Sequence, residues 1–417
     1  MISREMAEKY AFYVCAAGAA FSPLGPVVHY TCWGIALLFL LYLRIVFGVP
    51  LLNTGNAWGR KSLLLFGGVF AWIACVGLLT ADSLFAYGRN VSIVFEMAFG
   101  VWLAARLLCT DEKRQKFIQL FAAATVFICL GVLLREYGII PYFPNSTLIR
   151  NSNSLGGFAA FCAAPLGVFV FWTLQGRMAL QLCVLTLLDV VLLVSFASGA
   201  WLAGFACACV ILWYGVKYKK ICVKFLTALA VFTFACIACI NWATDGEILN
   251  SFSREYEQMT SVRDPEKLTT YRNEIWNVTL YLFNQRPITG WGGKDFKKLY
   301  DEVFATKKEQ LGLKLDLHGC HPHNTFLYLL YLGGVPALLL FAGALYYVMR
   351  KSLRLARSEA NTLYAWGVMS AAMTVCVLVN GLTGDVLQGR RDVAVIVWTV
   401  WGLIAGLPME RTESEQK

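Results

Sequence analysis

Stretches of about twenty apolar residues recur along the whole 417-residue chain, and this repetition limits the possible folds more than any other feature. A helix of about twenty residues is long enough to cross roughly 30 Å of hydrocarbon. Inside a membrane every backbone polar group needs a partner within the protein, and a helix supplies those partners. The sequence therefore predicts an all-α polytopic membrane protein.

The composition agrees with this class. The chain is 58% hydrophobic and 15% charged, whereas soluble domains are about 45–50% apolar and about 25% charged. The net charge of +10 does not indicate a nucleic-acid partner, because most basic residues lie in short loops beside apolar stretches. Of the 14 cysteines, all but Cys320 lie in or beside apolar stretches, where cysteine acts as a small apolar residue.

The apolar stretches predict about twelve membrane-spanning helices. We expect residues 1–243 to form nine of them, 244–322 to form a long and partly helical loop, and 323–417 to form the last three and a tail. The predicted spans are 11–24, 27–47, 62–81, 91–109, 117–134, 155–174, 178–196, 198–216, 225–243, 323–349, 361–383 and 392–408.

Basic residues cluster in alternate loops, and the positive-inside rule places such loops in the cytoplasm. Both termini are then inside, and the 244–322 loop faces the periplasm of a bacterial inner membrane. The clusters are Arg60 and Lys61; Lys113, Arg114 and Lys116; Lys217, Lys219 and Lys220; and Arg350, Lys351, Arg354 and Arg357.

Within the long loop, the segment 271–287 has the pattern of an amphipathic helix that Pro287 ends. Arg272 lies near the centre of its apolar arc, whereas Glu274 lies on the polar side with Asn273 and Asn277. An arginine at such a position either extends its charge to water or lipid phosphate, or is held at a partly dry site to bind an anion. The second interpretation makes Arg272 a candidate catalytic residue.

A glycine-rich turn follows at 287–293, with Arg286 directly before it. Proline and glycine force a turn there and let the backbone approach a ligand closely. A plain loop is the alternative. We include Arg286 among the candidate substrate-binding residues.

Three of the four histidines lie close together at His318, His321 and His323. Their spacing would suit a metal, but only Cys320 and Asp316 are near enough in the sequence to complete a tetrahedral set. We therefore expect no metal.

His323 follows Pro322 at the expected start of a span. The amino end of a helix disfavours the imidazolium form and so helps to keep a histidine neutral and able to accept a proton. The alternative is a histidine that merely marks the membrane boundary. We predict that His323 is a catalytic base, supported by Asn324.

Arg150, Arg390 and Arg391 lie beside spans on the predicted periplasmic side, against the orientation bias. Cations at such positions need a partner or a function. Several of them at one membrane face indicate an anionic substrate bound there.

These segments resemble the family of O-antigen ligases and related O-antigen polymerases. The resemblance rests on RNSNSLGGF (150–158), YRNEIW (271–276), PITGWG (287–292) and HPHNTFLYLLYLGGVPA (321–337). In the last segment, His323 and Asn324 precede nine residues, then Gly334, two residues and Ala337, which departs from the usual final residue. A larger departure lies in FASGAWLAG (196–204), where Ser198 stands at the position of an expected arginine.

The resemblance implies transfer of a glycan from an undecaprenyl diphosphate carrier to a sugar hydroxyl of lipid A–core at the periplasmic face. The implied enzyme inverts the anomeric carbon and needs neither metal nor cofactor. Arginine matches phosphate oxygens through two hydrogen bonds, and a neutral histidine suits removal of a hydroxyl proton. The candidates are His323 and Arg272 for catalysis, and Arg150, Arg286, Asn324, Arg390 and Arg391 for substrate binding.

Two other functions remain open. An O-antigen or capsule polymerase would perform the same chemistry on a different acceptor, and the motif spacing favours a ligase over it. A flippase or transporter for lipid-linked oligosaccharides would place charges near the middle of its spans. The candidate cations cluster instead at one face and in one loop, which favours an enzyme.

Overall fold

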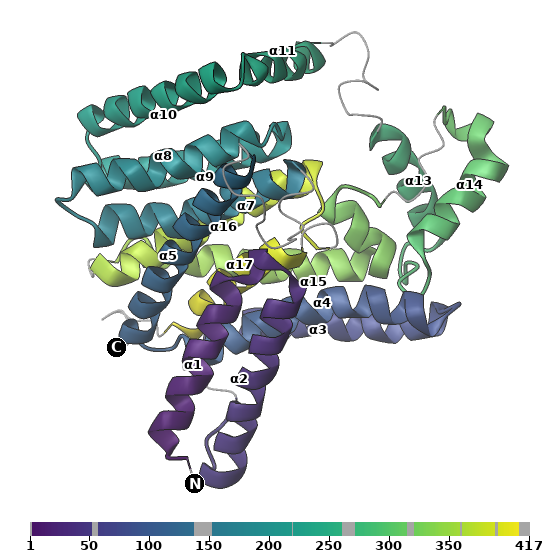
Figure 1. Ribbon diagram of the computed structural model, residues 1–417. Coiled ribbons are helices and arrows are strands. Elements are labelled where there is room, and N and C mark those ends of the chain that lie inside the picture. Colours follow the sequence, from purple (N-terminus) through teal and green to yellow (C-terminus); the bar gives the residue numbers. More distant parts are fainter. Residues whose placement is uncertain are drawn as a thin grey trace.

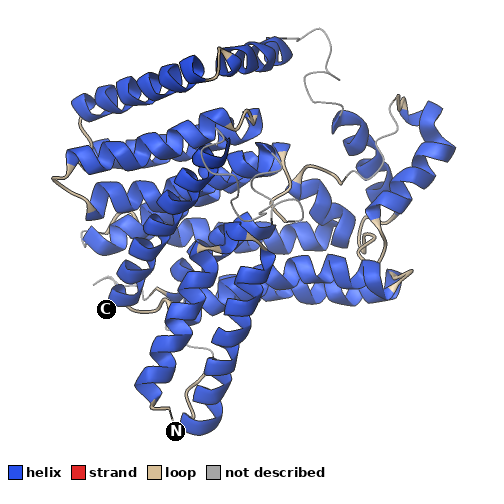
Figure 2. Cartoon of the chain, viewed as in Figure 1, coloured by secondary structure: helices blue, strands red, loops and turns tan. Residues whose placement is uncertain are grey.

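A computed structural model describes residues 2–51, 57–136, 152–218, 220–260, 272–314, 321–358, 361–387 and 391–407. Every regular element in these ranges is a helix (Figures 1 and 2). The elements are α1 (Arg4–Ala20), η1 (Ser22–Leu24), α2 (Pro26–Phe47), α3 (Ala57–Thr80), α4 (Leu84–Leu107), α5 (Asp111–Glu136), α7 (Ser152–Val168), the π-helical η2 (Phe169–Thr173), α8 (Met178–Val194), α9 (Ser198–Lys217), α10 (Val223–Ala243), α11 (Glu247–Thr260), α13 (Arg272–Gln285), α14 (Phe296–Leu311), α15 (Thr325–Leu355), α16 (Asn361–Thr383) and α17 (Arg391–Gly406).

Within the described residues, 9 helices are long and apolar enough to cross a membrane. Helices α8 and α17 are apolar but shorter, and α1 begins with a charged turn at Arg4 and Glu5. Together these give one helix for each of the predicted spans. The predicted class is therefore confirmed: the chain is an all-α polytopic membrane protein.

Helix α17 lies in the centre of the bundle. From Val393 to Ala405 every one of its residues is buried, as expected for a helix that is apolar on all sides. A Cβ atom added at Gly402 would lie 2.3 Å from the carbonyl oxygen of Val101 on α4. Only a residue without a side chain allows two membrane helices to approach so closely.

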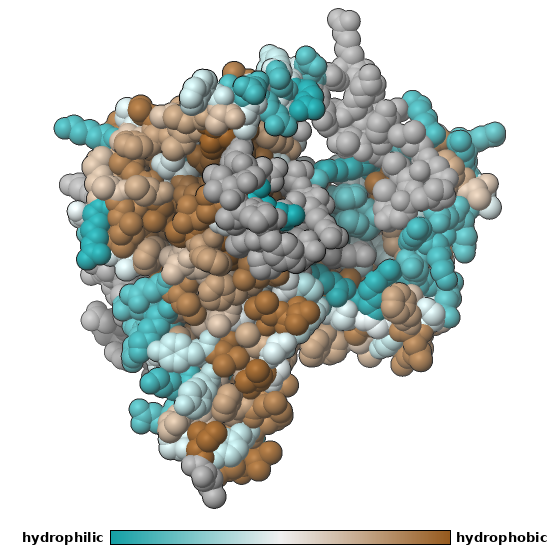
Figure 3. All heavy atoms as spheres, viewed as in Figure 1, coloured by the Kyte–Doolittle hydropathy of each residue, from teal (hydrophilic) through white to brown (hydrophobic). Residues whose placement is uncertain are grey.

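The loop between α10 and α15 contains helices α11, α13 and α14, so it is partly helical as expected. Helices α13 and α14 stand at the end of the molecule where α3 and α4 meet (Figure 1, right). The Gly293 backbone N–H donates to Thr80 Oγ1 over 3.0 Å, and Lys294 Nζ lies 3.1 Å from Asp82 Oδ1. Hydrophilic residues gather over this end, whereas much of the rest of the surface in view is apolar (Figure 3).

The hairpin of α1 and α2 extends away from the other helices (Figure 1, bottom). Helix α2 has exposed apolar side chains along its length, among them Val27, Leu38 and Ile45. Such a surface is stable in contact with lipid rather than water. The hairpin contributes one end of a polar network that is described below.

Candidate functional site

Helix α13 is amphipathic as predicted, and it buries Ile275, Val278 and Leu282. The helix also buries a carboxylate, which was not expected. Glu274, which the helical projection places on the polar side, is 2% exposed, and its Oε2 accepts a hydrogen bond from the Lys314 backbone N–H over 2.9 Å. The projection is wrong for Glu274 because the chain after α14 returns and covers that side of the helix.

The first turn of α13 is fixed at two points. Arg272 Nη1 donates to the carbonyl oxygen of Thr383, the last residue of α16. One turn further on, Trp276 Nε1 donates to the carbonyl oxygen of Pro322 over 3.0 Å. Residues four apart lie on the same helix face, so this face of α13 contacts both α16 and the segment that leads into α15.

The guanidinium group of Arg272 is partly buried, and this burial lowers the pKa of Arg272 from its ordinary value. Arginine remains a cation even so. Within the described part of the chain, Thr383 is the one hydrogen-bond partner of this side chain. A guanidinium has five N–H donors, so others are left to bind an anion.

Asn324 is the N-cap of α15, so the helix begins after Asn324 rather than at His323 as expected. Its Oδ1 accepts hydrogen bonds from the backbone N–H groups of Phe326 and Leu327, each over 3.0 Å. Its Nδ2 donates to the carbonyl oxygen of Leu382 over 3.0 Å, which leaves one amide N–H. His323 precedes the cap and has a left-handed backbone, with φ 49°.

Arg272 and Asn324 thus bind consecutive carbonyl groups, those of Thr383 and Leu382. These carbonyls belong to the last turn of α16, where a helix has no internal partners for them. His323 adjoins both Asn324 and the Pro322 carbonyl that α13 binds. We call the group Arg272, Trp276, His323 and Asn324 the His323 site.

The imidazole ring of His321 lies close to that of His323, with ring centroids 4.1 Å apart. His318 and Cys320 lie outside the described residues. Among the residues that are described, the structure brings no three potential metal ligands together. The absence of a metal stays a prediction.

Arg286 lies at the other end of α13, beside the last turn of that helix. Its guanidinium carbon is 4.2 Å from the centre of the Trp291 ring. Fourteen residues of helix span about 21 Å, so Arg286 and Arg272 are too far apart to bind the same pair of phosphates. The structure does not bring these two candidates together.

The turn at 287–293 packs against the backbone of α15. The Trp291 backbone N–H donates to the carbonyl oxygen of Tyr331 over 2.6 Å, and the Val335 N–H donates to that of Pro287 over 2.8 Å. A Cβ atom at Gly334, whose φ is +64°, would lie 2.4 Å from the Pro287 oxygen. The glycines on both sides therefore allow two backbones to meet.

Arg391 is held by helix α4. Its Nη1 lies 3.1 Å from Glu96 Oε1 and 3.2 Å from Ser92 Oγ, and its Nη2 donates to the carbonyl oxygen of Arg89 over 3.1 Å. Tyr30 on α2 donates to the same Glu96 oxygen. The charge of Arg391 is therefore paired within the protein, and its contact with substrate stays a prediction. Arg150 and Arg390 lie outside the described residues.

The position at which the resemblance led us to expect an arginine lies close to Thr383, the partner of Arg272. Ser198 is the first residue of α9, and a Cβ atom at the next residue, Gly199, would lie 2.3 Å from Thr383 Oγ1. Thr383 is also the residue whose carbonyl group Arg272 binds. Sequence reasoning missed Trp276 as a site residue and Thr383 as the partner of Arg272, because the contacting residues are far apart in the chain.

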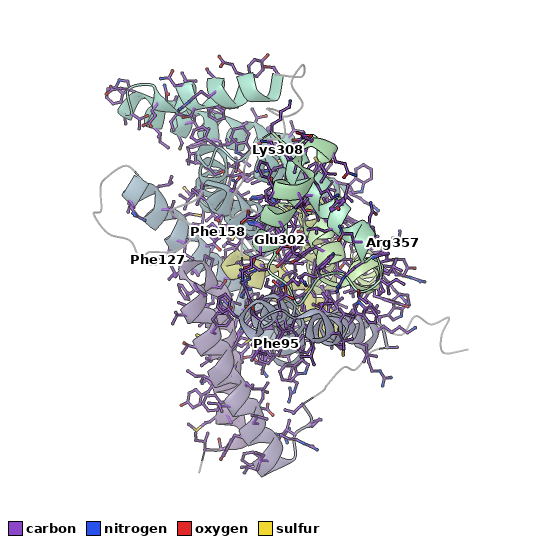
Figure 4. The ribbon with its side chains drawn as sticks, turned by 90° about the vertical axis from the view of Figure 1, so that its right-hand side faces the viewer. Phe95, Phe127, Phe158, Glu302, Lys308 and Arg357 are labelled. Atoms are coloured by element: carbon purple, nitrogen blue, oxygen red, sulfur yellow. The ribbon has the colours of Figure 1, made fainter. Side chains whose placement is uncertain are left out.

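Figure 4 looks onto the side of the molecule that carries α13 and α14, with Glu302 and Lys308 of α14 labelled. Both side chains are exposed. The exposed face of α14 thus carries both signs of charge rather than a uniformly basic surface.

Residues 182–342 match the family model described as O-antigen ligase. The match includes Arg272, Arg286, His323, Asn324 and Gly334. No curated protein matches the chain. The family match covers less than half of the chain, and together with the membrane-spanning helices it supports a glycosyltransferase of the O-antigen ligase and polymerase type in general.

Proposed function

We propose that the protein transfers a glycan from undecaprenyl diphosphate to a sugar hydroxyl of lipid A–core at the periplasmic face of the inner membrane. The observation that carries this proposal is the binding of consecutive α16 carbonyls by Arg272 and Asn324. From these contacts we infer that a guanidinium group and a histidine act at one site. A cation for a phosphate leaving group and a base for a hydroxyl are the two groups that the reaction requires.

In the proposed reaction the acceptor hydroxyl oxygen attacks the anomeric carbon of the donor sugar. The bond from that carbon to the diphosphate oxygen breaks, and undecaprenyl diphosphate leaves with the electron pair. His323 takes the hydroxyl proton, and Arg272 stabilises the negative charge on the leaving diphosphate. Direct attack inverts the configuration of the anomeric carbon, and no metal takes part.

The remaining candidates have separate places in the proposal. Asn324 offers its one remaining amide N–H to the substrate. Arg286 binds a part of the substrates other than the diphosphate, because about 21 Å of helix separates it from Arg272. Arg391 contacts substrate only through N–H groups that do not bind Ser92, Glu96 or Arg89. Arg150 and Arg390 are the other two proposed substrate-binding arginines.

Transfer by purified protein from a lipid-linked glycan to lipid A–core tests the role of His323. We expect His323→Ala to lower the rate about 10²–10⁴-fold, the usual contribution of general-base catalysis, while binding of the lipid-linked donor persists. His321→Ala is the matched control, because its ring lies beside that of His323, and it should be much milder. Near-normal transfer by His323→Ala would remove the base assignment.

The same assay separates the proposal from its nearest alternatives. A polymerase would extend a second lipid-linked glycan and leave lipid A–core unmodified, which would overturn the acceptor assignment. Strong inhibition by a chelator, with equal losses for substitutions of His318, His321 and His323, would show a metal-dependent reaction instead.

A further inference from the structure

A cavity of about 380 Å³ lies at the end of α15 that is opposite the His323 site. Helix α15 has 31 residues with a break at Gly333 and Gly334, so its two ends are at most about 46 Å apart. Arg357, which lines the cavity, is labelled in Figure 4. The lining residues are Trp58, Arg350, Lys351, Leu353, Arg354 and Arg357.

The lining is strongly basic. None of these lining residues is acidic, and Arg350, Arg354 and Arg357 follow one another at helical spacing on one side of the chain. Like charges four residues apart repel and destabilise a helix. Membrane orientation requires basic residues near the end of a span, but it does not require them to line one cavity. A negatively charged ligand would be attracted to the exposed Arg350 and Arg357.

Arg350 is held in place before any ligand binds. Its guanidinium carbon lies 4.3 Å from the centre of the Trp58 ring, and its Nη1 donates to the Tyr346 hydroxyl over 3.0 Å. An arginine stacked on an aromatic ring keeps most of its N–H donors free to bind phosphate oxygens in the plane of the fork.

Lys351 has a different role. It is 2% exposed, and its Nζ donates to the carbonyl oxygens of Ala405 over 3.2 Å and Leu407 over 2.7 Å. A cation at the carboxyl end of α17 stabilises that end of the helix. The charges available to a ligand are therefore chiefly those of the exposed Arg350 and Arg357.

The side chains around the cavity are of the types that surround lipid headgroups. Tryptophan and tyrosine concentrate at the membrane–water interface, and both Trp58 and Tyr346 lie here. Along the same two helices, Leu64 on α3 is 68% exposed and Leu339 on α15 is 65% exposed. Acyl chains would find an apolar surface along the same two helices that line the cavity.

We propose that this cavity binds the phosphate of an anionic phospholipid headgroup in the membrane leaflet opposite the His323 site. Basic cavities between membrane helices recognise anionic headgroups in this way. Inorganic phosphate shares the chemistry of the headgroup but lacks the acyl chains, so an experiment can separate the two sources.

Native mass spectrometry of the purified full chain in neutral detergent tests the proposal. The protein is titrated with phosphatidylglycerol, with phosphatidylcholine and with inorganic phosphate. We expect wild-type protein to retain phosphatidylglycerol in preference to phosphatidylcholine, and Arg350→Gln/Arg357→Gln to retain roughly tenfold less of it. Arg44→Gln/Arg177→Gln is the matched control, since it removes two positive charges predicted to lie on the same membrane face.

Equal loss of phosphatidylglycerol in both double variants would overturn the proposal, because it would show a response to total charge alone. Binding of inorganic phosphate as tight as that of phosphatidylglycerol would replace the lipid by a soluble anion. Arg350→Lys/Arg357→Lys keeps the charge and removes the planar fork. We therefore expect this variant to bind less phosphatidylglycerol than wild type and more than the glutamine variant. A lysine variant as weak as the glutamine variant at unchanged thermal stability would contradict an electrostatic headgroup site.

Discussion

At the scale of single residues, the sequence locates a charge more readily than the group that the charge contacts. Helical periodicity places Arg272 correctly on the packed side of α13, but its partner Thr383 is 111 positions away. The same holds for Arg391, whose ion pair with Glu96 joins residues 295 positions apart. With one sequence, no local pattern indicates either contact. The sequence could therefore predict the candidate cations. It could not predict which of them are paired within the protein and which can bind an anion.

Arg272→Lys tests whether a guanidinium is needed rather than a charge. Lysine can still donate one hydrogen bond to Thr383, so the fold should persist, but it lacks the planar fork that binds phosphate at two points. A hydrogen bond to a charged group contributes about 1.5–3 kcal/mol, so we expect transfer to fall roughly ten- to a hundredfold. The measurement is the transfer rate of purified protein.

Arg254→Lys is the matched control for Arg272→Lys. Arg254 is an exposed arginine of α11 that donates to Ser251 Oγ over 2.9 Å, and its replacement should leave transfer unchanged. Normal transfer by Arg272→Lys would show that the arginine only holds α13 against α16.

Asn324 performs two tasks that substitutions can separate. Asn324→Asp keeps the oxygen that caps α15 but loses the amide donor to Leu382, whereas Asn324→Ala loses both. Loss of an N-cap costs about 1 kcal/mol, so we expect a lower thermal midpoint for the alanine variant than for the aspartate variant. Both variants should transfer slowly if the contact with α16 positions His323.

A substitution at the N-cap of another helix tests whether a loss of stability alone lowers transfer. Ser83 caps α4, and its Oγ accepts from the Ala86 backbone N–H over 3.2 Å. Ser83→Ala should lower stability and retain transfer. Full activity of Asn324→Asp would contradict the positioning role of its amide.

At the scale of elements, each predicted span coincides with a helix, because apolar stretches of membrane length allow little else. The break inside α15 was not predicted. Gly333 and Gly334 have non-helical dihedral angles there, and the turn after α13 contacts this break. The nine residues between Asn324 and Gly334 thus separate the cap of α15 from its break. The motif spacing was visible in the sequence, but the contact that explains it was not.

Gly334→Ala tests that contact. The backbone at Gly334 has φ +64° and ψ −162°, a combination that residues with a side chain rarely adopt, and the added Cβ would lie 2.4 Å from two backbone oxygens. Strained dihedral angles alone cost about 1–3 kcal/mol. We expect a clearly lower thermal midpoint in detergent and reduced transfer.

Gly343→Ala is the control in the same helix. Its added Cβ would meet only the flexible Leu65 side chain, 3.4 Å away, so stability should be equal to or above that of wild type. Unchanged stability and transfer for Gly334→Ala would show that the turn and the break are not coupled.

At the scale of the whole molecule, α15 connects two ends of different chemistry. Its start carries the His323 site beside the hydrophilic helices α13 and α14, and its end carries the basic cavity. We propose that the chemistry takes place at the first end, and the charge distribution predicts which end faces the cytoplasm. Both proposals depend on this orientation: the glycan donor and the anionic headgroup must lie in opposite leaflets.

Thiol labelling in cells tests the orientation directly. In a variant that keeps only Cys320, a membrane-impermeant maleimide should label cells whose outer membrane has been made permeable, because residues 244–322 are predicted to face the periplasm. A variant that keeps only Cys109, between α4 and α5, is the reverse control and should react only after the inner membrane is opened. Both variants must first retain transfer activity, which shows that removing the other cysteines leaves the fold intact. Labelling of Cys109 but not Cys320 in sealed cells would invert the molecule and move the His323 site to the cytoplasm.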